Sequence, residues 1–214
     1  MKQVAIVTGG ASGIGLALGT ALVQRGWHVV LADIQDVAGK EHADRITRFG
    51  PGSAVGAQLD VRDAEGVAGL VESTHAEHGR LDLMVNNAGI AIAGEPEELE
   101  LAHWDRIIDV NLRGVIHGCQ AVYPLMLRQG EGQILNVASA AGLIPTAGQM
   151  APYGLPSSVW SGSAVDCVLR VPITGSGSPP CARGGSTPRC WTERGPRTCP
   201  SRPRSPRCRP SVST

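Results

Sequence analysis

The sequence predicts an α/β fold in which helices cover both faces of a doubly wound parallel sheet. Two observations indicate this fold. Short apolar runs without polar alternation recur along the first 154 residues, and segments with helical apolar spacing separate them. Strands buried on both faces carry such unbroken runs, and parallel strands need crossover helices. A third observation limits the size of the fold, because 214 residues suffice for one α/β domain and are few for two.

The expected elements alternate along the chain. Apolar, β-branched runs predict strands at 3–8, 27–33, 53–59, 81–85 and 133–138. Helical spacing predicts helices at 14–25, 37–49, 64–78 and 103–128. Since each helix follows a strand, the order is typical of repeated crossover units.

The composition changes near residue 154. Residues 1–154 contain 10 Lys and Arg against 17 acidic residues, a net charge of −7, whereas residues 155–214 contain 9 Arg against 2 acids, a net charge of +7. The later segment also contains 10 of the 15 prolines and five of the six cysteines. It buries too little apolar surface to offset an ordering entropy of about 1–2 kcal/mol per residue. We therefore expect one domain over 1–154 and a disordered Pro/Arg/Ser-rich tail over 155–214.

The sequence also argues against several classes of protein. The first apolar run reaches Gly9 too early for a signal peptide, and no run approaches the roughly 20 apolar residues that span a bilayer. These features predict a cytoplasmic protein without membrane contact. The tail cysteines suggest a disulfide module only weakly, because no export signal accompanies them. The tail arginines suggest a nucleic-acid arm only weakly, because Trp160 and Trp191 alone offer base stacking there.

A glycine-rich turn joins the first expected strand to the first helix. It reads Thr8-Gly9-Gly10-Ala11-Ser12-Gly13-Ile14-Gly15. Glycines at such a turn let the backbone approach a pyrophosphate, and the helix N-terminus presents unpaired N–H groups to it. Asp33 closes the second strand, where a carboxylate accepts ribose hydroxyls and repels a 2′-phosphate. No Lys or Arg follows directly, so NAD is expected rather than NADP. A bare strand-to-helix connector and a solvated acid are the alternatives.

Residues 3–153 resemble the classical short-chain dehydrogenase/reductase family. The turn has that family's spacing Thr-Gly-x-x-x-Gly-x-Gly, and the further matches are Asp60-Val61, Asn86-Asn87-Ala88-Gly89, Asn111, Ser139 and Tyr153. The resemblance implies a Rossmann-like fold and hydride transfer between a nicotinamide cofactor and a small alcohol or carbonyl substrate. The cofactor-binding residues that it implies are Gly9, Ser12, Gly13, Ile14, Gly15, Asp33, Asp60, Val61, Asn87, Ala88 and Gly89.

The resemblance also implies a role for each catalytic residue. Tyr153 would transfer the substrate proton, Ser139 would bind the substrate oxygen, and Asn111 would hold a water of the proton relay. The family places a lysine four residues after the tyrosine, whose charge favours the phenolate, but Ser157 stands there. Acid–base help of typically about 10² to 10⁴-fold is then in question. The expected function is an NAD-dependent oxidoreductase, and a catalytically impaired dinucleotide-binding remnant is the alternative.

We interpret the change near residue 154 as a shift of reading frame. With permitted codons and one base restored after Gly154, the chain reads YGASKFGVVGL from Tyr153 and continues as SGGLRAEGADYGVRVSAVCPG. The lysine returns, followed by an amphipathic helix and a strand. The truncated sheet would leave the fifth strand as an unpaired apolar edge and lack a helix of the family's homo-oligomer interface. We expect poor solubility and weak turnover.

The remaining candidates predict no further site. His75 and His78 lie one helical turn apart with Glu72 nearby, but a solvated polar face is expected there rather than a metal site. The expected substrate lining, 89–96 and 140–149, is small and apolar without a charged anchor. It suits a modest, uncharged alcohol or ketone.

Overall fold

The computed structural model describes residues 2–139, 168–170, 189–192 and 195–198 of the chain. The chain divides into two compact units, Met1–Ile173 and Thr174–Thr214. In the second unit, the described residues form an antiparallel hairpin of β7 (Arg189–Thr192) and β8 (Gly195–Thr198). None of the described helices is both long and apolar enough to cross a bilayer.

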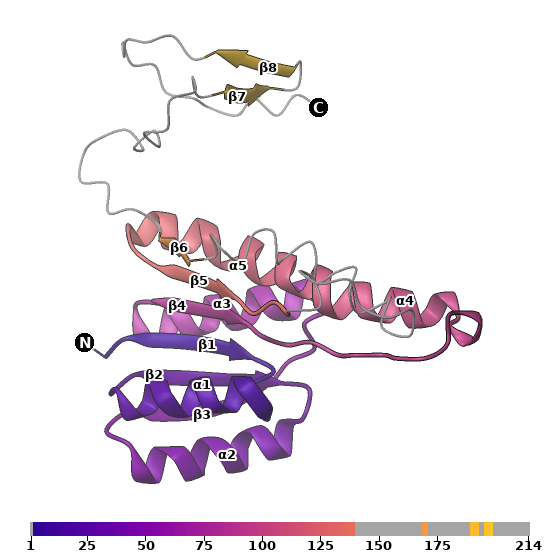
Figure 1. Ribbon diagram of the computed structural model, residues 1–214. Coiled ribbons are helices and arrows are strands. Elements are labelled where there is room, and N and C mark those ends of the chain that lie inside the picture. The colour runs from indigo at the N-terminus through magenta and orange to yellow at the C-terminus, as the bar shows by residue number, and fades with distance from the viewer. Residues whose placement is uncertain (1, 140–167, 171–188, 193–194, 199–214) are drawn as a thin grey trace. The chain divides into compact units, whose positions relative to one another are not determined.

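The first unit contains a six-stranded sheet in the order β3-β2-β1-β4-β5-β6 (Figure 1). Its strands are β1 (Val4–Thr8), β2 (His28–Asp33), β3 (Ser53–Gln58), β4 (Leu83–Asn86), β5 (Gln133–Asn136) and β6 (Val168–Arg170). The helices are α1 (Gly13–Gln24), α2 (Asp36–Phe49), α3 (Ala64–His78), α4 (Leu101–Ile108) and α5 (Gly114–Gln129). Strands β1 to β5 are parallel, which confirms the expected fold class.

Two hydrophobic cores, one on each face of the sheet, explain the unbroken apolar strands. Helices α1 and α2 cover one face, where Val23 and Ile46 pack with Val29 and Leu31. Helices α3 and α5 cover the other, where Val67, Val71, Val122 and Met126 pack with Ile6 and Met84. All five residues of the central strand β1 are buried. Because both faces of β1 and β2 are covered, neither strand has a polar alternation.

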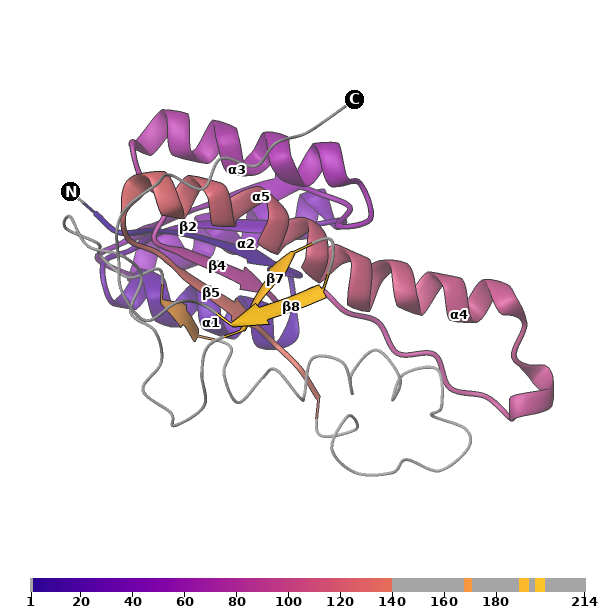
Figure 2. The ribbon, with the colours of Figure 1, turned by 90° about the horizontal axis from the view of Figure 1, so that it is seen from above.

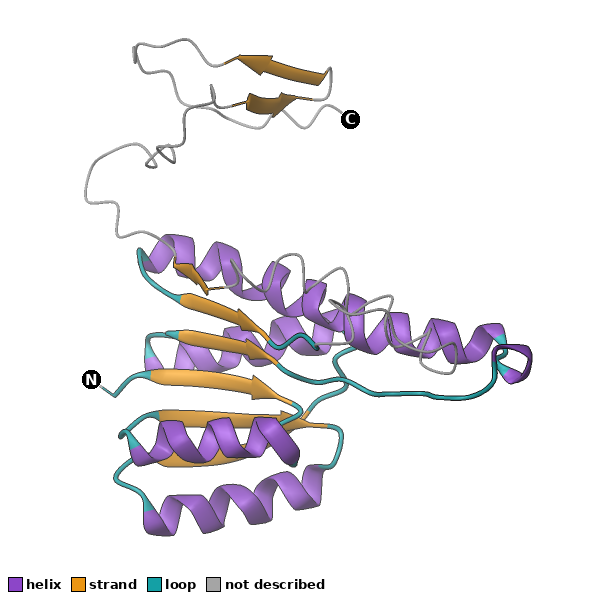
Figure 3. Cartoon of the chain, viewed as in Figure 1, coloured by secondary structure: helices purple, strands orange, loops and turns teal. Residues whose placement is uncertain are grey.

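The order of the strands reverses between β1 and β4. From β1 the chain moves outward to β2 and β3, and then crosses to β4 and β5 on the other side. Figure 3 shows the arrowheads of β1 to β5 at one common edge, where loops join the strands to the helices. In such sheets, ligands bind outside the carboxyl ends of the strands at the point of reversal.

The long helix expected over 103–128 is interrupted in the structure. A π-helical turn at Asp109–Arg113, labelled η2, separates α4 from α5, and the N–H of Gly114 donates to the carbonyl of Asp109. Figure 2 shows that α4 and α5 nevertheless continue along almost the same line. Five residues are too few for apolar periodicity to distinguish a π-helical turn from an α-helical one. The turn contains Asn111, which is one of the expected catalytic residues.

The edge of the sheet beside β5 also differs from the expectation. Strand β6 pairs antiparallel with β5, with Leu135 opposite Val168 and Ile134 opposite Leu169. The apolar pair Val168-Leu169 suits an extended segment, and an open edge offers unpaired N–H and C=O groups to it. Three short strands therefore lie in the segment 155–214, and its other residues lie outside those described.

Candidate functional site

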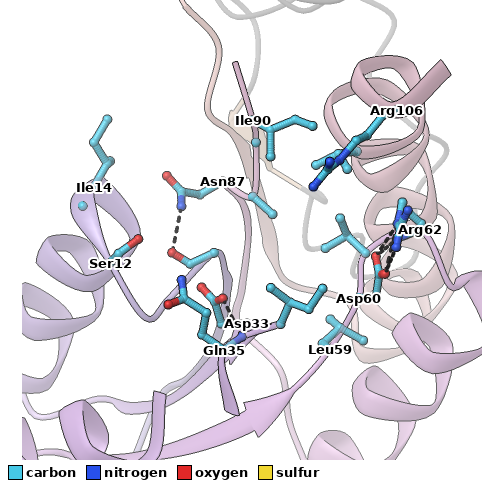
Figure 4. Close-up of a pocket in the computed structure, with 17 residues that line it drawn as sticks. Ser12, Ile14, Asp33, Gln35, Leu59, Asp60, Arg62, Asn87, Ile90 and Arg106 are labelled. Atoms are coloured by element: carbon cyan, nitrogen blue, oxygen red, sulfur yellow. Dashed lines mark hydrogen bonds and ion pairs between the residues drawn. The ribbon is translucent and has the colours of Figure 1, made fainter. Parts of the chain in front are cut away.

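A pocket of about 400 Å³ opens at the carboxyl edge of the sheet (Figure 4). It lies where β1 and β4 are neighbours and the strand order reverses. Ten of the eleven residues expected to bind the cofactor line it: Gly9, Ser12, Gly13, Ile14, Asp33, Asp60, Val61, Asn87, Ala88 and Gly89. The structure therefore brings together residues that are up to 80 positions apart in the sequence, such as Gly9 and Gly89.

Gly15 is the eleventh residue, and it does not line the pocket. It is buried behind the turn, where an added Cβ would overlap the Gly9 carbonyl oxygen and lie 2.6 Å from Asn87 Nδ2. Gly15 therefore lets helix α1 pack closely against the turn and does not itself face a ligand. At Gly13 the backbone conformation, and not the available space, favours glycine. Its φ is +50°, whereas an added Cβ would meet nothing within 4 Å.

A network centred on Thr8 fastens the turn to the end of β4. Thr8 Oγ1 donates to the Val85 carbonyl at 3.2 Å and accepts the N–H groups of Asn87 and Ala88, both at 3.0 Å. Asn87 Nδ2 in turn donates to the carbonyl oxygens of Thr8 at 2.9 Å and Gly9 at 3.3 Å. These bonds cross the point of strand reversal, so they hold the two sides of the pocket in one geometry.

The N-terminus of α1 is suited to bind an anion. Ser12 makes no side-chain cap, and the first turn contains no acidic residue. By contrast, Asp63 caps α3 by accepting the N–H groups of Glu65 and Gly66. A helix N-terminus carries unpaired N–H groups and a partial positive charge, and here Gly13 and Ile14 of the first turn line the pocket. This end of the pocket can therefore hold a phosphate.

Asp33 places a carboxylate in the same pocket. The residue is 8% exposed, and its two oxygens accept the N–H groups of Ala11 and Gln35, both at 3.0 Å. An ionised carboxylate offers about four lone pairs, so Asp33 can still accept hydroxyl groups of a ligand. The cations that line the pocket, Arg62 and Arg106, belong to other elements and lie opposite Ser12 and Ile14 in Figure 4.

Asp60 and Arg62 form an ion pair at that opposite side. Arg62 Nη2 lies 2.6 Å from Asp60 Oδ2, and Arg62 Nε lies 3.0 Å from both carboxylate oxygens. The side-chain hydrogen bonds from Arg62 lower the pKa of Asp60 below its ordinary value, although partial burial raises it. Asp60 is therefore an ionised acceptor at neutral pH.

Sequence reasoning missed six residues that line the pocket. They are Ile34, Gln35, Leu59, Arg62, Arg106 and Val110, whereas Ile90 belongs to the expected substrate lining 89–96. None of the six belongs to a motif, and most were indicated only by their positions beside expected site residues. Arg62 had one further signal, its position two residues after Asp60, from which its side chain reaches back to the carboxylate.

The structure describes two of the three expected catalytic residues. Asn111 is half-buried, and its side chain accepts the N–H of Ile90 and donates to the Ile90 carbonyl, both at 2.8 Å. Because Ile90 lines the pocket, Asn111 holds one of its walls. Ser139 is half-buried and follows β5 by three residues. Tyr153, and Ser157 after it, lie outside the described residues.

The histidines considered for a metal face lie away from this pocket. Within the described ranges, no group of three or more His, Cys, Asp or Glu residues is arranged to hold a metal ion. The ring of His78 instead lies against that of His28, with centroids 4.2 Å apart.

Comparison with known proteins identifies the family of this chain. The family model described as short chain dehydrogenase matches residues 3–154. The chain belongs to the short chain dehydrogenase family. A solved family structure, a short chain dehydrogenase/reductase from Burkholderia phymatum in complex with NAD, superposes with a TM-score of 0.72 at 31% identity. That superposition covers 77% of this chain and 58% of the other.

Curated members of the family show similar levels of identity. D-threitol dehydrogenase of Mycolicibacterium smegmatis is 39% identical over 142 residues, which are 66% of this chain and 54% of that protein. 2-(R)-hydroxypropyl-CoM dehydrogenase of Xanthobacter autotrophicus is 37% identical over 162 residues, covering 71% of this chain and 62% of that protein. The chain thus spans less than two thirds of the length of these relatives.

Proposed function

We propose that this short chain dehydrogenase binds NAD and transfers a hydride between it and a small alcohol or carbonyl substrate. The observation that carries the proposal is the pairing, in one pocket, of the uncapped N-terminus of α1 with the carboxylate of Asp33. A pyrophosphate suits the first and ribose hydroxyls suit the second. The NAD-complexed structure from Burkholderia phymatum, with a TM-score of 0.72, supports the same assignment.

The described residues fit the parts of this cofactor. Gly13 and Ile14 would bind the pyrophosphate through their N–H groups, Asp33 the adenosine ribose, and Asp60 with Val61 the adenine. Asn87, Ala88 and Gly89 would border the nicotinamide half. When bound, NAD supplies the carbon that accepts or donates the hydride. NAD is favoured over NADP because Asp33 would repel a 2′-phosphate and Ile34 and Gln35 offer it no charge.

The substrate proton and oxygen are assigned to three residues. Tyr153 would exchange the proton, Ser139 would donate a hydrogen bond to the substrate oxygen, and Asn111 would hold a water between this centre and solvent. The wall that Asn111 fixes through Ile90 supports this placement. The apolar residues after Gly89 favour a modest, uncharged alcohol or ketone.

We further propose that the chain after residue 154 is read in a shifted frame. The family match ends at residue 154, where the net charge and proline content change and where the expected lysine is replaced by Ser157. Restoring one base returns a lysine four residues after Tyr153. Sequencing of the gene around codons 154 and 155 beside close relatives tests this directly. A gene without a missing base contradicts it.

Titration with both dinucleotides tests the cofactor assignment. We expect the chain to bind NAD more tightly than NADP, and Asp33→Ala to reduce that preference by tenfold or more, about what loss of a charged hydrogen bond gives. Asp44→Ala is the matched control, because it removes one exposed acidic residue of α2 away from the pocket. Equal affinity for NAD and NADP in the unmodified chain, or no binding of either, contradicts the assignment.

A further inference from the structure

We propose that Arg62 is a positioning residue that makes the pocket specific for a 6-amino purine over a 6-oxo purine, by holding Asp60 as a fixed hydrogen-bond acceptor. The inference rests on the proposed dinucleotide function, and it assigns a role to a residue that no motif identifies.

The first step is the geometry of the pair. Arg62 engages both oxygens of Asp60, through Nε at 3.0 Å to each and through Nη2 at 2.6 Å to Oδ2, and the Arg62 backbone N–H adds a bond to Oδ1 at 3.0 Å. A planar guanidinium that contacts both oxygens fixes the plane of the carboxylate as well as its place. These contacts come from three N–H groups of Arg62, so about one of the four lone pairs of the carboxylate remains, and both residues line the pocket.

The second step is the donor next to this acceptor. Val61 lines the pocket, its carbonyl accepts from His117 Nδ1 at 2.9 Å, and its N–H makes no hydrogen bond to another described residue. Asp60 and Val61 thus offer an acceptor and a donor on consecutive residues of the pocket, which Leu59 and Val110 also line. A flat heterocycle that offers a donor beside an acceptor complements this pair.

The third step is the chemistry of the purine edge. Adenine presents its 6-amino donor beside the N1 acceptor, which matches a carboxylate followed by an N–H. Hypoxanthine presents a 6-oxo acceptor beside an N1–H donor. Its 6-oxo group would face the carboxylate acceptor, and its N1–H would face the Val61 N–H donor. Rejection of such an analogue comes from the polar groups that it leaves unpaired.

The fourth step is what arginine adds to the carboxylate. A carboxylate of ordinary pKa is already ionised at neutral pH, so its charge alone does not require Arg62. The contacts from Arg62 to both oxygens instead hold the carboxylate plane, and with it the direction of the lone pair that remains for a ligand. The pair is partly exposed, with 48% of the Arg62 side chain and 32% of the Asp60 side chain accessible, and such pairs add little to stability. Its effect is therefore expected in base selection.

Calorimetric titration of the full chain with NAD and with nicotinamide hypoxanthine dinucleotide tests the inference. We expect the unmodified chain to prefer NAD, and Arg62→Gln to reduce that preference about tenfold, mainly through weaker NAD binding. Arg62→Lys should recover only part of it, because an ammonium group cannot reproduce the two-point contact. Asp60→Asn should reduce the preference most, since an amide can donate as well as accept.

Arg45→Gln is the matched control, because Arg45 is an exposed arginine of α2 that does not line the pocket. It should leave both affinities and their ratio unchanged. The inference is overturned if Arg62→Gln retains the preference for NAD, or if it weakens both ligands equally. If the unmodified chain binds neither dinucleotide, the proposed function fails and the inference with it. Binding of NAD with an unchanged preference in Arg62→Gln refutes the role of Arg62 alone.

Discussion

Single residues of the first turn differ in what a side chain would meet there. Gly15 faces the Gly9 carbonyl and Asn87 Nδ2 across a gap that has no room for a Cβ. We predict that Gly15→Ala lowers the free energy of unfolding by about 1–3 kcal/mol, because the overlap involves backbone atoms that cannot yield freely. NAD affinity should fall with it, since α1 must move away from the turn. Chemical denaturation and NAD titration measure the two effects.

Gly69 provides the control for this substitution. It lies in the interior of α3, it is exposed, and an added Cβ would meet nothing within 4 Å. Gly69→Ala should therefore raise the free energy of unfolding by about 0.5–1 kcal/mol, because alanine favours the helix, and should leave NAD affinity unchanged. If the two substitutions change the free energy of unfolding in opposite directions, the effect at Gly15 comes from packing at the turn and not from the added methyl group in general. Equal stability of both variants would contradict this account of the turn.

At the scale of elements, the rings of His28 at the start of β2 and His78 at the end of α3 lie against each other. His28 begins β2, its Nδ1 lies 2.8 Å from Ser53 Oγ, and its Nε2 is buried without a partner among the described residues. Burial lowers the pKa of His28 below its ordinary value, and the nearby His78 and Lys2 lower it further, while Glu77 raises it. The folded chain therefore binds a proton at His28 less readily than the unfolded chain does.

The lower pKa of His28 in the folded chain determines how the free energy of unfolding changes with pH. Above the ordinary histidine pKa of about 6.5 the contribution to stability is fully present, and it is lost as the pH falls toward the lower pKa of the folded state. We predict that the free energy of unfolding decreases between about pH 7.5 and about pH 5, and that His28→Gln makes this decrease smaller. Urea denaturation across this range measures it, with His42→Gln on α2 as the control. The same slope in wild type and His28→Gln would refute the role of His28.

The elements also show which parts of the fold were readable from the sequence. Strands β1 to β5 and their helices follow from apolar periodicity, because burial on both faces leaves a pattern in each segment. The π-helical turn around Asn111 leaves no such pattern, and the side chain of Asn111 hydrogen-bonds to Ile90, 21 positions away in the sequence. Strand β6 depends on an edge that forms only once β5 has joined the sheet.

The sequence also predicted part of the candidate site. Its motif residues could be placed on one edge because parallel strands end together, and ten of them line the pocket. Gly15 does not line the pocket, and spacing does not distinguish a glycine that faces a ligand from one that faces the backbone. Arg62 and Arg106 were missed because their contribution depends on where the chain after β3 and helix α4 lie in space.

At the scale of the whole molecule, the described pocket belongs entirely to the part of the chain before residue 139. Among the described residues, the proposed dinucleotide site is therefore formed by residues that precede the tail. Proton transfer differs, because it is assigned to Tyr153 and to a lysine that Ser157 replaces. Binding and turnover should consequently respond differently to repair of the reading frame.

Three chains test this separation: the chain as it stands, its frame-repaired version, and the repaired version with its restored lysine replaced by serine. We predict NAD binding by all three and substantial turnover of small alcohols only by the repaired chain. Replacing the lysine should lower that turnover by about 10² to 10⁴-fold, because the tyrosine loses the charge that favours its phenolate. Calorimetry and an NADH absorbance assay measure binding and turnover. Equal turnover by the chain as it stands and by the repaired chain would show that proton transfer needs neither the lysine nor the restored strands.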